Sequence, residues 1–237
     1  MLKSFIEREN EILGIIEAVI KSGLNYVLVG GYAVSAYMHR FSVDADICID
    51  KKDTDSFRNL LKSNHCAMTK RRGLEDIYKG EFECYVKKTK LPIIVDLMIG
   101  SVASRQTNAS ISFHSLFENS VIKKIIGAEK SIEARIPVKE ALIALKIHAA
   151  RMTDARDIVA LCEDIDYNLV ERFVKRGNSR EVHDNIKNLI IHFKSDNFKD
   201  SFKGVFSIEK LPVNNINNAV KLMERLKNYK TGSIEND

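Results

Sequence analysis

Residues 26–49 read YVLVGGYAVSAYMHRFSVDADICI, and this stretch decides the expected fold. It opens with four apolar residues that are typical of a short buried strand, and the run stops at Gly30 and Gly31. A short helix is predicted over residues 32–39. The double glycine predicts a tight turn at which the backbone can approach a ligand closely. Free N–H groups at the start of the following helix would suit a phosphate group.

The end of the same stretch carries two acidic residues on what should be a second strand. Residues 43–49 alternate between apolar and polar or small side chains, which places Asp44 and Asp46 on one face. Two unpaired carboxylates so close together repel each other and favour a bound cation. Asp96 lies within PIIVDLMI, residues 92–99, the most strand-like run in the chain. Three carboxylates on neighbouring strands predict a site for Mg²⁺, which prefers oxygen ligands and also takes oxygens from a triphosphate.

This ordered set resembles the signature of the polymerase-β-like nucleotidyltransferase superfamily: a hydrophobic residue and two glycines, a short helix, Asp-x-Asp, and a distant third acid in a strand. The resemblance covers residues 26–50 and 93–98. It implies an α/β mixed-sheet core that uses Mg²⁺ (or Mn²⁺) and a nucleoside triphosphate. It also implies that Asp44, Asp46 and Asp96 bind the metal and are catalytic. The implied reaction moves a nucleoside monophosphate to an acceptor hydroxyl and releases pyrophosphate.

A second segment resembles one branch of that superfamily, the AbiEii-type toxin-like nucleotidyltransferases. Residues 139–161 read KEALIALKIHAARMTDARDIVAL. In that branch a helical lysine is followed by an Arg-Asp pair on the next helix. By position, Lys146 matches the catalytic lysine that contacts the triphosphate. Asp157, in the pair Arg156-Asp157, matches the catalytic partner.

The resemblance to this branch also implies residues that bind the nucleotide in the first half of the chain. Arg40 and Ser42 match the Arg and the Ser or Thr that precede the first aspartate. Gly30 and Gly31 complete the implied phosphate-binding turn. The sequence departs from the branch at Ala45, where the residue between the two acids is often Ile or Leu.

Plainer interpretations of these residues stay open. Lys146 could be a lysine whose stem lies along the apolar face of its own helix. The Arg156-Asp157 pair could be an ordinary surface pair, and Arg151 and Asp154 compete with it for any role beside the lysine.

The expected organisation is an α/β domain over residues 1–137 and a helical domain over 138–237 that closes the nucleotide cleft. A helix is predicted over 54–64, with Asp53 or Thr54 as its cap. The remaining predicted helices are 2–22, 138–151, 153–164, 167–176, 180–194 and 214–229, and the remaining predicted strands are 74–79, 82–87, 111–113 and 132–136.

The composition is that of a globular protein with a mild excess of positive charge. The chain has 237 residues, of which 45% are hydrophobic and 29% charged, and a formal net charge of +5. No run reaches 18 apolar residues, so no membrane span is expected. The N-terminus lacks the apolar core of a signal peptide, and a cytoplasmic protein with reduced thiols is expected. The basic runs KRR (70–72) and KKTK (87–90) are either solvated faces or a track for an RNA acceptor.

The acceptor is not decided by the sequence. RNA such as a tRNA 3′ end, a protein hydroxyl and a small molecule all stay open, and the toxin-like resemblance implies an antitoxin protein as a partner. Two other classes of function compete. A non-catalytic nucleotide-binding module with a toxin-like or regulatory role would not need the third acid. An antibiotic nucleotidyltransferase would favour an acidic cleft, whereas this chain has 37 Lys and Arg against 32 Asp and Glu.

Overall fold

The computed structural model describes residues 2–73 and 80–227, which form two compact units. Within the described residues, the first unit holds the chain up to Val102 together with Ser112–Pro137. The second unit holds Ala103–Ile111 together with the chain from Val138 onward. The strand expected at 74–79 lies outside the described residues.

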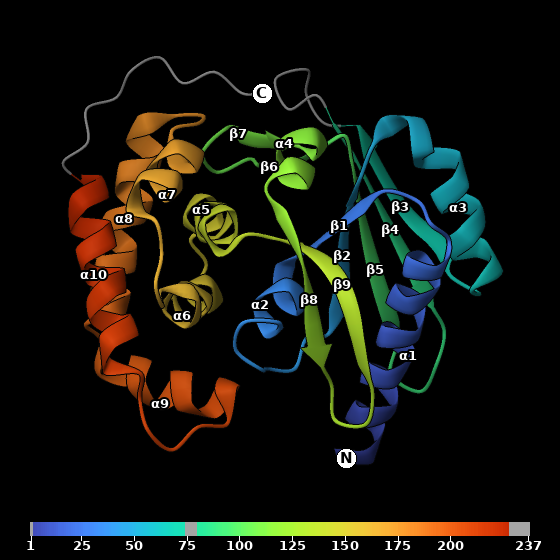
Figure 1. Ribbon diagram of the computed structural model, residues 1–237, viewed down its shortest axis with the longest axis horizontal. Coiled ribbons are helices and arrows are strands. Elements are labelled where there is room, and N and C mark those ends of the chain that lie inside the picture. Colours follow the sequence, from blue (N-terminus) through green and yellow to red (C-terminus); the bar gives the residue numbers. More distant parts are fainter. Residues whose placement is uncertain (1, 74–79, 228–237) are drawn as a thin grey trace. The chain divides into compact units, whose positions relative to one another are not determined.

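The first unit is built on a five-stranded mixed sheet (Figure 1). Strands β2 and β5 are its parallel pair, and the other neighbours in the order β1-β2-β5-β4-β3 are antiparallel. The predicted α/β fold with a mixed sheet and a helical C-terminal region is therefore confirmed. The strands are β1 (Tyr26–Val29), β2 (Asp44–Ile49), β3 (Ala67–Gly73), β4 (Glu81–Lys87) and β5 (Ile93–Ile99).

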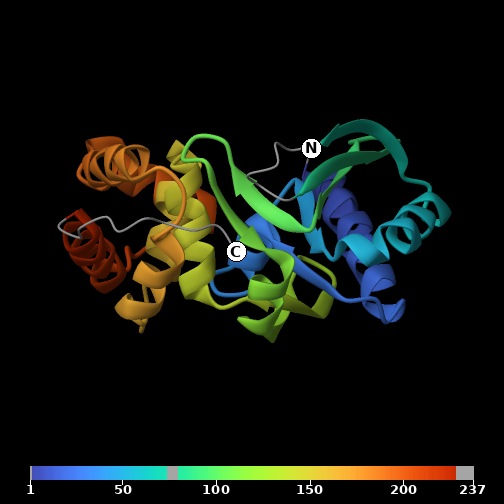
Figure 2. The same cartoon turned by 90° about the horizontal axis from the view of Figure 1, so that it is seen from above.

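One face of this sheet is closed by two helices, α1 (Leu2–Lys21) and α3 (Thr54–Ser63). Figure 2 shows these helices next to each other on the same side of the sheet. Ala45, Ile47 and Val95 are fully buried on this face. Because side chains alternate along a strand, the neighbours of these residues point to the opposite face of the sheet. Asp44, Asp46 and Asp96 are among these neighbours.

Helix α2 (Gly30–Ser35) differs from the predicted helix at 32–39, because it begins at the first glycine and ends four residues earlier. Gly30 has φ +66°, a conformation that glycine adopts without strain, so the chain turns directly from β1 into the helix. After α2 the chain returns through an irregular segment to β2.

Asp53, one of the two predicted caps, is the N-cap residue of α3 by position. Asp53 makes no side-chain hydrogen bond at the N-cap, because a 3-10 turn, η1 (Lys51–Asp53), leads into the helix. Asp50 caps that turn instead and accepts from the N–H of Lys52 at 3.2 Å. The hydroxyl of Thr54 donates to the Lys51 carbonyl at 2.6 Å.

The other strands among the described residues form two-stranded sheets. Strands β8 and β9 form an antiparallel hairpin, and β9 runs beside β1. The predicted strands at 111–113 and 132–136 correspond to β7 and β9, whereas β6, β8 and helix α4 were not expected. The elements are β6 (Ser101–Ser104), β7 (Ala109–Ser112), α4 (Phe113–Glu118), β8 (Ser120–Ile126) and β9 (Ser131–Pro137).

The second unit is helical, and the short segment Ala103–Ile111 packs with its helices. The Ser104 hydroxyl donates to the His148 carbonyl at 2.8 Å, and the Asn178 N–H donates to the Thr107 carbonyl at 2.5 Å. These hydrogen bonds between distant parts of the chain were not expected from the sequence. The division into domains 1–137 and 138–237 stays a prediction. The helices are α5 (Lys139–Ala149), α6 (Met152–Leu161), α7 (Tyr167–Val174), α8 (Ser179–Phe193), α9 (Asp196–Phe206) and α10 (Val213–Lys227).

Helix α9 is the helix of this unit that the sequence did not predict. It buries Phe198, Phe202 and Phe206, which recur every four residues and so share one face. This spacing was a usable signal. None of the helices in the described part of the chain is long and apolar enough to cross a membrane.

Candidate active site

Three carboxylates meet on the open face of the sheet in the first unit. Asp46 on β2 lies directly opposite Asp96 on β5, and Asp44 lies two residues before Asp46 on the same face. One carboxylate oxygen from each residue lies within 4.8 Å of those of the other two. The parallel pairing of β2 and β5 therefore brings together acids that are 50 residues apart in the sequence.

Asp96 is the least satisfied of these acids. Its Oδ1 is buried and has no hydrogen-bond partner among the described residues. Burial raises the pKa of the Asp96 carboxyl above its usual value, and the negative charge of Asp44 raises it further. A bound cation would relieve both effects. Since all three donors are hard carboxylate oxygens, they fit Mg²⁺ or Mn²⁺.

The glycine turn lies against the acids. A Cβ atom on Gly30 would stand 1.9 Å from Oδ2 of Asp46, and a Cβ atom on Gly31 would stand 2.1 Å from Oγ of Ser42. A side chain at either position would therefore displace a residue of the site. Both positions need glycine because of close approach, and Gly30 needs it also because of its positive φ.

Ser42 and Arg40 lie beside this turn. The Ser42 hydroxyl donates to Oδ1 of Asp44 at 3.4 Å, and Tyr32 donates from its hydroxyl to the Ser42 carbonyl at 3.3 Å. Nη2 of Arg40 is 3.1 Å from the position that a Cβ on Gly31 would take. The structure thus brings together all of the site residues that the sequence indicated in the first half of the chain.

The contact between Gly30 and Asp46 makes a testable prediction. Gly30→Ala is expected to weaken Mn²⁺ binding at the acidic cluster about tenfold, because the new methyl group pushes a metal-ligating carboxylate aside. Isothermal titration calorimetry of the parent and the variant measures the change. Gly23→Ala is the matched control, since Gly23 has φ +71° and no atom within 4 Å of its Cβ position. Equal losses in both variants would attribute the effect to backbone strain alone.

The second unit holds a different cluster, around Lys146. This side chain is buried, and its Nζ lies 2.7 Å from Asp157 and 3.0 Å from Asp154. Burial alone would lower the pKa of Lys146, but the two carboxylates outweigh it and raise the pKa. Lys146 is therefore a protonated ammonium held between two acids.

Asp154 is the residue of this cluster that the sequence could not separate from its competitors. It is fully buried, accepts from the backbone N–H of Arg151 at 3.0 Å, and pairs with the Arg151 Nε at 2.9 Å. Arg156 lies elsewhere, because its Nη1 donates to Ser201 of α9 at 2.7 Å. Asp157 forms an ion pair with Lys146, whereas its neighbour Arg156 contacts α9 instead.

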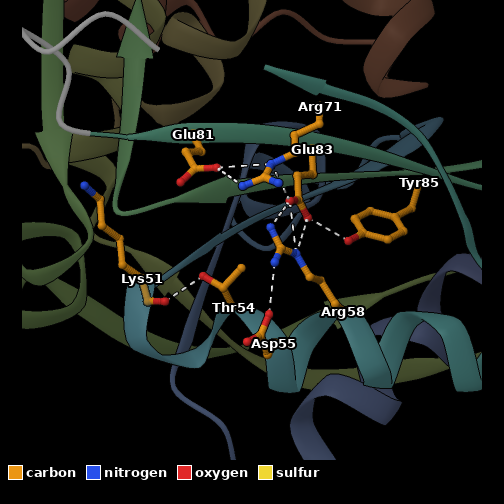
Figure 3. A network of polar contacts seen from close by, with 8 residues as sticks. All are labelled: Lys51, Thr54, Asp55, Arg58, Arg71, Glu81, Glu83 and Tyr85. Atoms are coloured by element: carbon orange, nitrogen blue, oxygen red, sulfur yellow. Dashed lines mark hydrogen bonds and ion pairs between the residues drawn. The ribbon is translucent and has the colours of Figure 1, made fainter. Parts of the chain in front are cut away.

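A fourth acid of the first unit shows how a structural carboxylate differs from those of the site (Figure 3). Glu83 on β4 is fully buried on the face covered by α1 and α3. Arg58 of α3 donates to it from Nε at 3.1 Å, and the Tyr85 hydroxyl donates at 2.7 Å. Burial works to raise the pKa of Glu83, but these donors lower it below its usual value. At Glu83 the protein partners outweigh the effect of burial on the pKa, whereas at Asp96 the effect of burial prevails.

Two solved structures with the same fold come from Helicobacter pylori. A Helicobacter pylori protein described as a "putative nucleotidyltransferase" matches 94% of this chain over 95% of its own length, with a TM-score of 0.52 and 15% identity. The protein JHP933 from Helicobacter pylori matches 94% of this chain over 92% of its length, with a TM-score of 0.51 and 15% identity. The chain shares its fold with these two proteins. No family model and no curated protein matches the chain.

At 15% identity, the likeness shows a common fold. It agrees with the α/β mixed-sheet fold that the resemblance to nucleotidyltransferases implied. Membership of the AbiEii-type branch stays a prediction.

Proposed function

We propose that this chain is a metal-dependent nucleotidyltransferase. The observation that carries the proposal is the meeting of Asp44, Asp46 and Asp96, with ligand oxygens within 4.8 Å of one another, beside a turn that only glycine fits. Such a cluster of hard oxygen donors is suited to a divalent ion that also binds phosphate oxygens. The fold shared with a protein described as a nucleotidyltransferase supports the same reaction class.

In the proposed reaction, the acceptor hydroxyl oxygen attacks the α-phosphorus of a nucleoside triphosphate. The bond from that phosphorus to the bridging oxygen breaks, and pyrophosphate leaves. Asp44, Asp46 and Asp96 would hold the divalent ion, Mg²⁺ or Mn²⁺, which would supply positive charge to the phosphates. Asp96 takes up the proton of the acceptor hydroxyl on its carboxylate.

Other residues of the first unit position the triphosphate. Gly30 and Gly31 keep the turn free of side chains, so that phosphate oxygens can approach the backbone. Ser42, which hydrogen-bonds Asp44, presents its hydroxyl next to the turn, and Arg40 adds positive charge there. We assign Lys146 and Asp157 to the nucleotide site on the resemblance to the AbiEii-type branch; their ion pair keeps the ammonium charged.

The test is transfer of label from each of four α-labelled nucleoside triphosphates, with Mg²⁺, into total cellular RNA and protein. Label that appears with the parent protein and disappears in Asp44→Ala would support the proposal and identify both the base and the class of acceptor. Transfer that is unchanged in Asp44→Ala would overturn it. Absence of label with the parent, alongside intact Mg²⁺-dependent nucleotide binding, would favour a small-molecule acceptor or a non-catalytic binding module.

A further inference from the structure

We propose that the acceptor is single-stranded RNA, and that it reaches the three acids across the open face of the sheet from the β3 edge, where Lys70 and Arg72 bind its phosphates. This inference rests on the proposed function and names its substrate class. It is built on strand register, exposure and charge in the first unit.

The register places Lys70 in line with the acids. Lys70 lies opposite Cys84 on β4, Cys84 lies opposite Asp96 on β5, and Asp96 lies opposite Asp46 on β2. Directly opposed residues of neighbouring strands project from the same face of a sheet. One row of side chains therefore runs from the metal site to the sheet edge.

Arg72 extends this row along the strand. It lies opposite Phe82 on β4, and the two-residue step from Lys70 keeps both cations on one face, about 7 Å apart along β3. Phe82 is only partly buried, so its ring offers a surface on which a base can stack. A site for single-stranded nucleic acid usually combines cations along the sugar-phosphate backbone with aromatic rings on which the bases stack.

Arg71, which lies between these two cations in the sequence, points to the other face of the sheet. This is the covered face, where Arg71 pairs with Glu81 at 2.9 Å and with Glu83 at 3.5 Å (Figure 3). Over the described residues, no ion pair involves Lys70 or Arg72. Every residue of β3 is exposed, and β3 is an edge strand of the sheet. The two cations are therefore available to a ligand, whereas Arg71 serves the fold.

The position of the glycine turn decides which side the acceptor uses. Gly30 approaches Asp46, and β1, which leads into the turn, pairs with β2 on the side away from β5. The triphosphate is expected at this turn. The acceptor hydroxyl must then approach from the opposite side of the acids, past Asp96 and across β4 and β3. Lys70 and Arg72 lie on that side, so they meet the acceptor strand and not the triphosphate.

A binding measurement tests this inference without any need for turnover. A short fluorescein-labelled single-stranded RNA of mixed sequence is titrated, by fluorescence anisotropy, with full-length Asp44→Ala and with the same chain carrying K70E and R72E. We expect the two added substitutions to weaken binding at least about tenfold. The slope of log affinity against log salt concentration should become shallower by the amount that corresponds to about two phosphate contacts. The matched control carries K51E and K52E, exposed cations beyond the other end of β2, with the same change in charge.

The outcomes separate this inference from the proposed function. Equal weakening by the control would show a general charge effect and would overturn the assigned track, as would no weakening by K70E and R72E in protein with an unchanged circular dichroism spectrum. RNA that does not bind, together with an acidic peptide that binds through Lys70 and Arg72, would replace RNA by a protein acceptor. The proposed function is tested separately, by transfer of label with the parent and with Asp44→Ala, and the RNA-binding measurement does not depend on transfer.

Discussion

Asp96→Asn is expected to lower nucleotidyl transfer about a thousandfold while leaving the metal-free protein at least as stable as its parent. Activity falls because asparagine removes the negative charge and one anionic ligand from the metal site. Stability is retained, or rises by up to about 1 kcal/mol, because a half-buried carboxylate without a hydrogen-bond partner on Oδ1 is replaced by a neutral group of the same shape. Binding sites often combine such opposite effects on function and stability.

Glu83→Gln is the control for this prediction, since Glu83 is a buried acid on the neighbouring strand β4. Its charge is compensated by Arg58 and by the hydroxyl of Tyr85, so we expect the substitution to reduce the free energy of unfolding by about 2 kcal/mol. Transfer by the folded fraction should be almost unchanged. Chemical denaturation in the presence of EDTA and transfer rates with saturating Mg²⁺ measure both quantities in both variants.

Two results would contradict this account. A loss of stability in Asp96→Asn as large as that in Glu83→Gln would mean that Asp96 is a structural acid with a partner. Retained transfer in Asp96→Asn would mean that the metal site does not need its third carboxylate. Either result would move the proposed site away from β5.

The cluster of three acids was predictable because its signals are local. Along β2 the acids alternate with buried small or apolar residues, whereas Asp96 is the one acid in the apolar run of β5, IIVDLMI. Asp44, Asp46 and Asp96 therefore stand out in the sequence. What the sequence did not show was the close approach of Gly30 to Asp46, because a contact between two segments depends on the path of the chain between them.

The strand β3 shows the opposite case. All residues of Ala67–Gly73 are exposed, so no burial pattern marks the strand. Its hydrogen bonds to β4 and a bulge between Met68 and Lys70 give it its place in the sheet. The same run of basic residues, which the sequence left as either a solvated face or an RNA track, splits in the structure. Lys70 and Arg72 lie on the face of the acids, and Arg71 pairs on the other face.

The cluster around Lys146 was only partly predictable. Lys146 and Asp157 were indicated by resemblance, and the structure pairs them. Arg151 and Asp154 could not be separated from the Arg156-Asp157 pair on the sequence, because a break between α5 and α6 decides which residues of α6 face Lys146. Ala150 has φ +42° at this break, a left-handed conformation that is uncommon for alanine. The turn directs Asp154 back towards Lys146.

Lys146→Met is expected to reduce the free energy of unfolding of the protein by about 3 kcal/mol. Methionine keeps much of the apolar stem, but it leaves the buried carboxylates of Asp154 and Asp157 without the ammonium that neutralises them. Asp154 retains Arg151, which limits the loss. Lys187→Met is the matched control, because Lys187 pairs with Asp184 on the surface of α8, where solvent screens the pair, and the substitution should cost much less than Lys146→Met. Urea denaturation monitored by circular dichroism measures both variants.

A double variant decides whether the loss comes from the uncompensated charge. Adding Asp154→Asn to Lys146→Met removes one of the two carboxylates that have lost their ammonium partner. The double variant should therefore lose less free energy of unfolding than the sum of the losses in the two single variants. Strict additivity would show that Lys146 and Asp154 do not depend on each other. A loss in Lys146→Met no larger than that in Lys187→Met would mean that the ion pairs do not stabilise the helical unit. Lys146 would then be kept for its proposed contact with the triphosphate, and nucleotide affinity in the folded variant would be the property to fall.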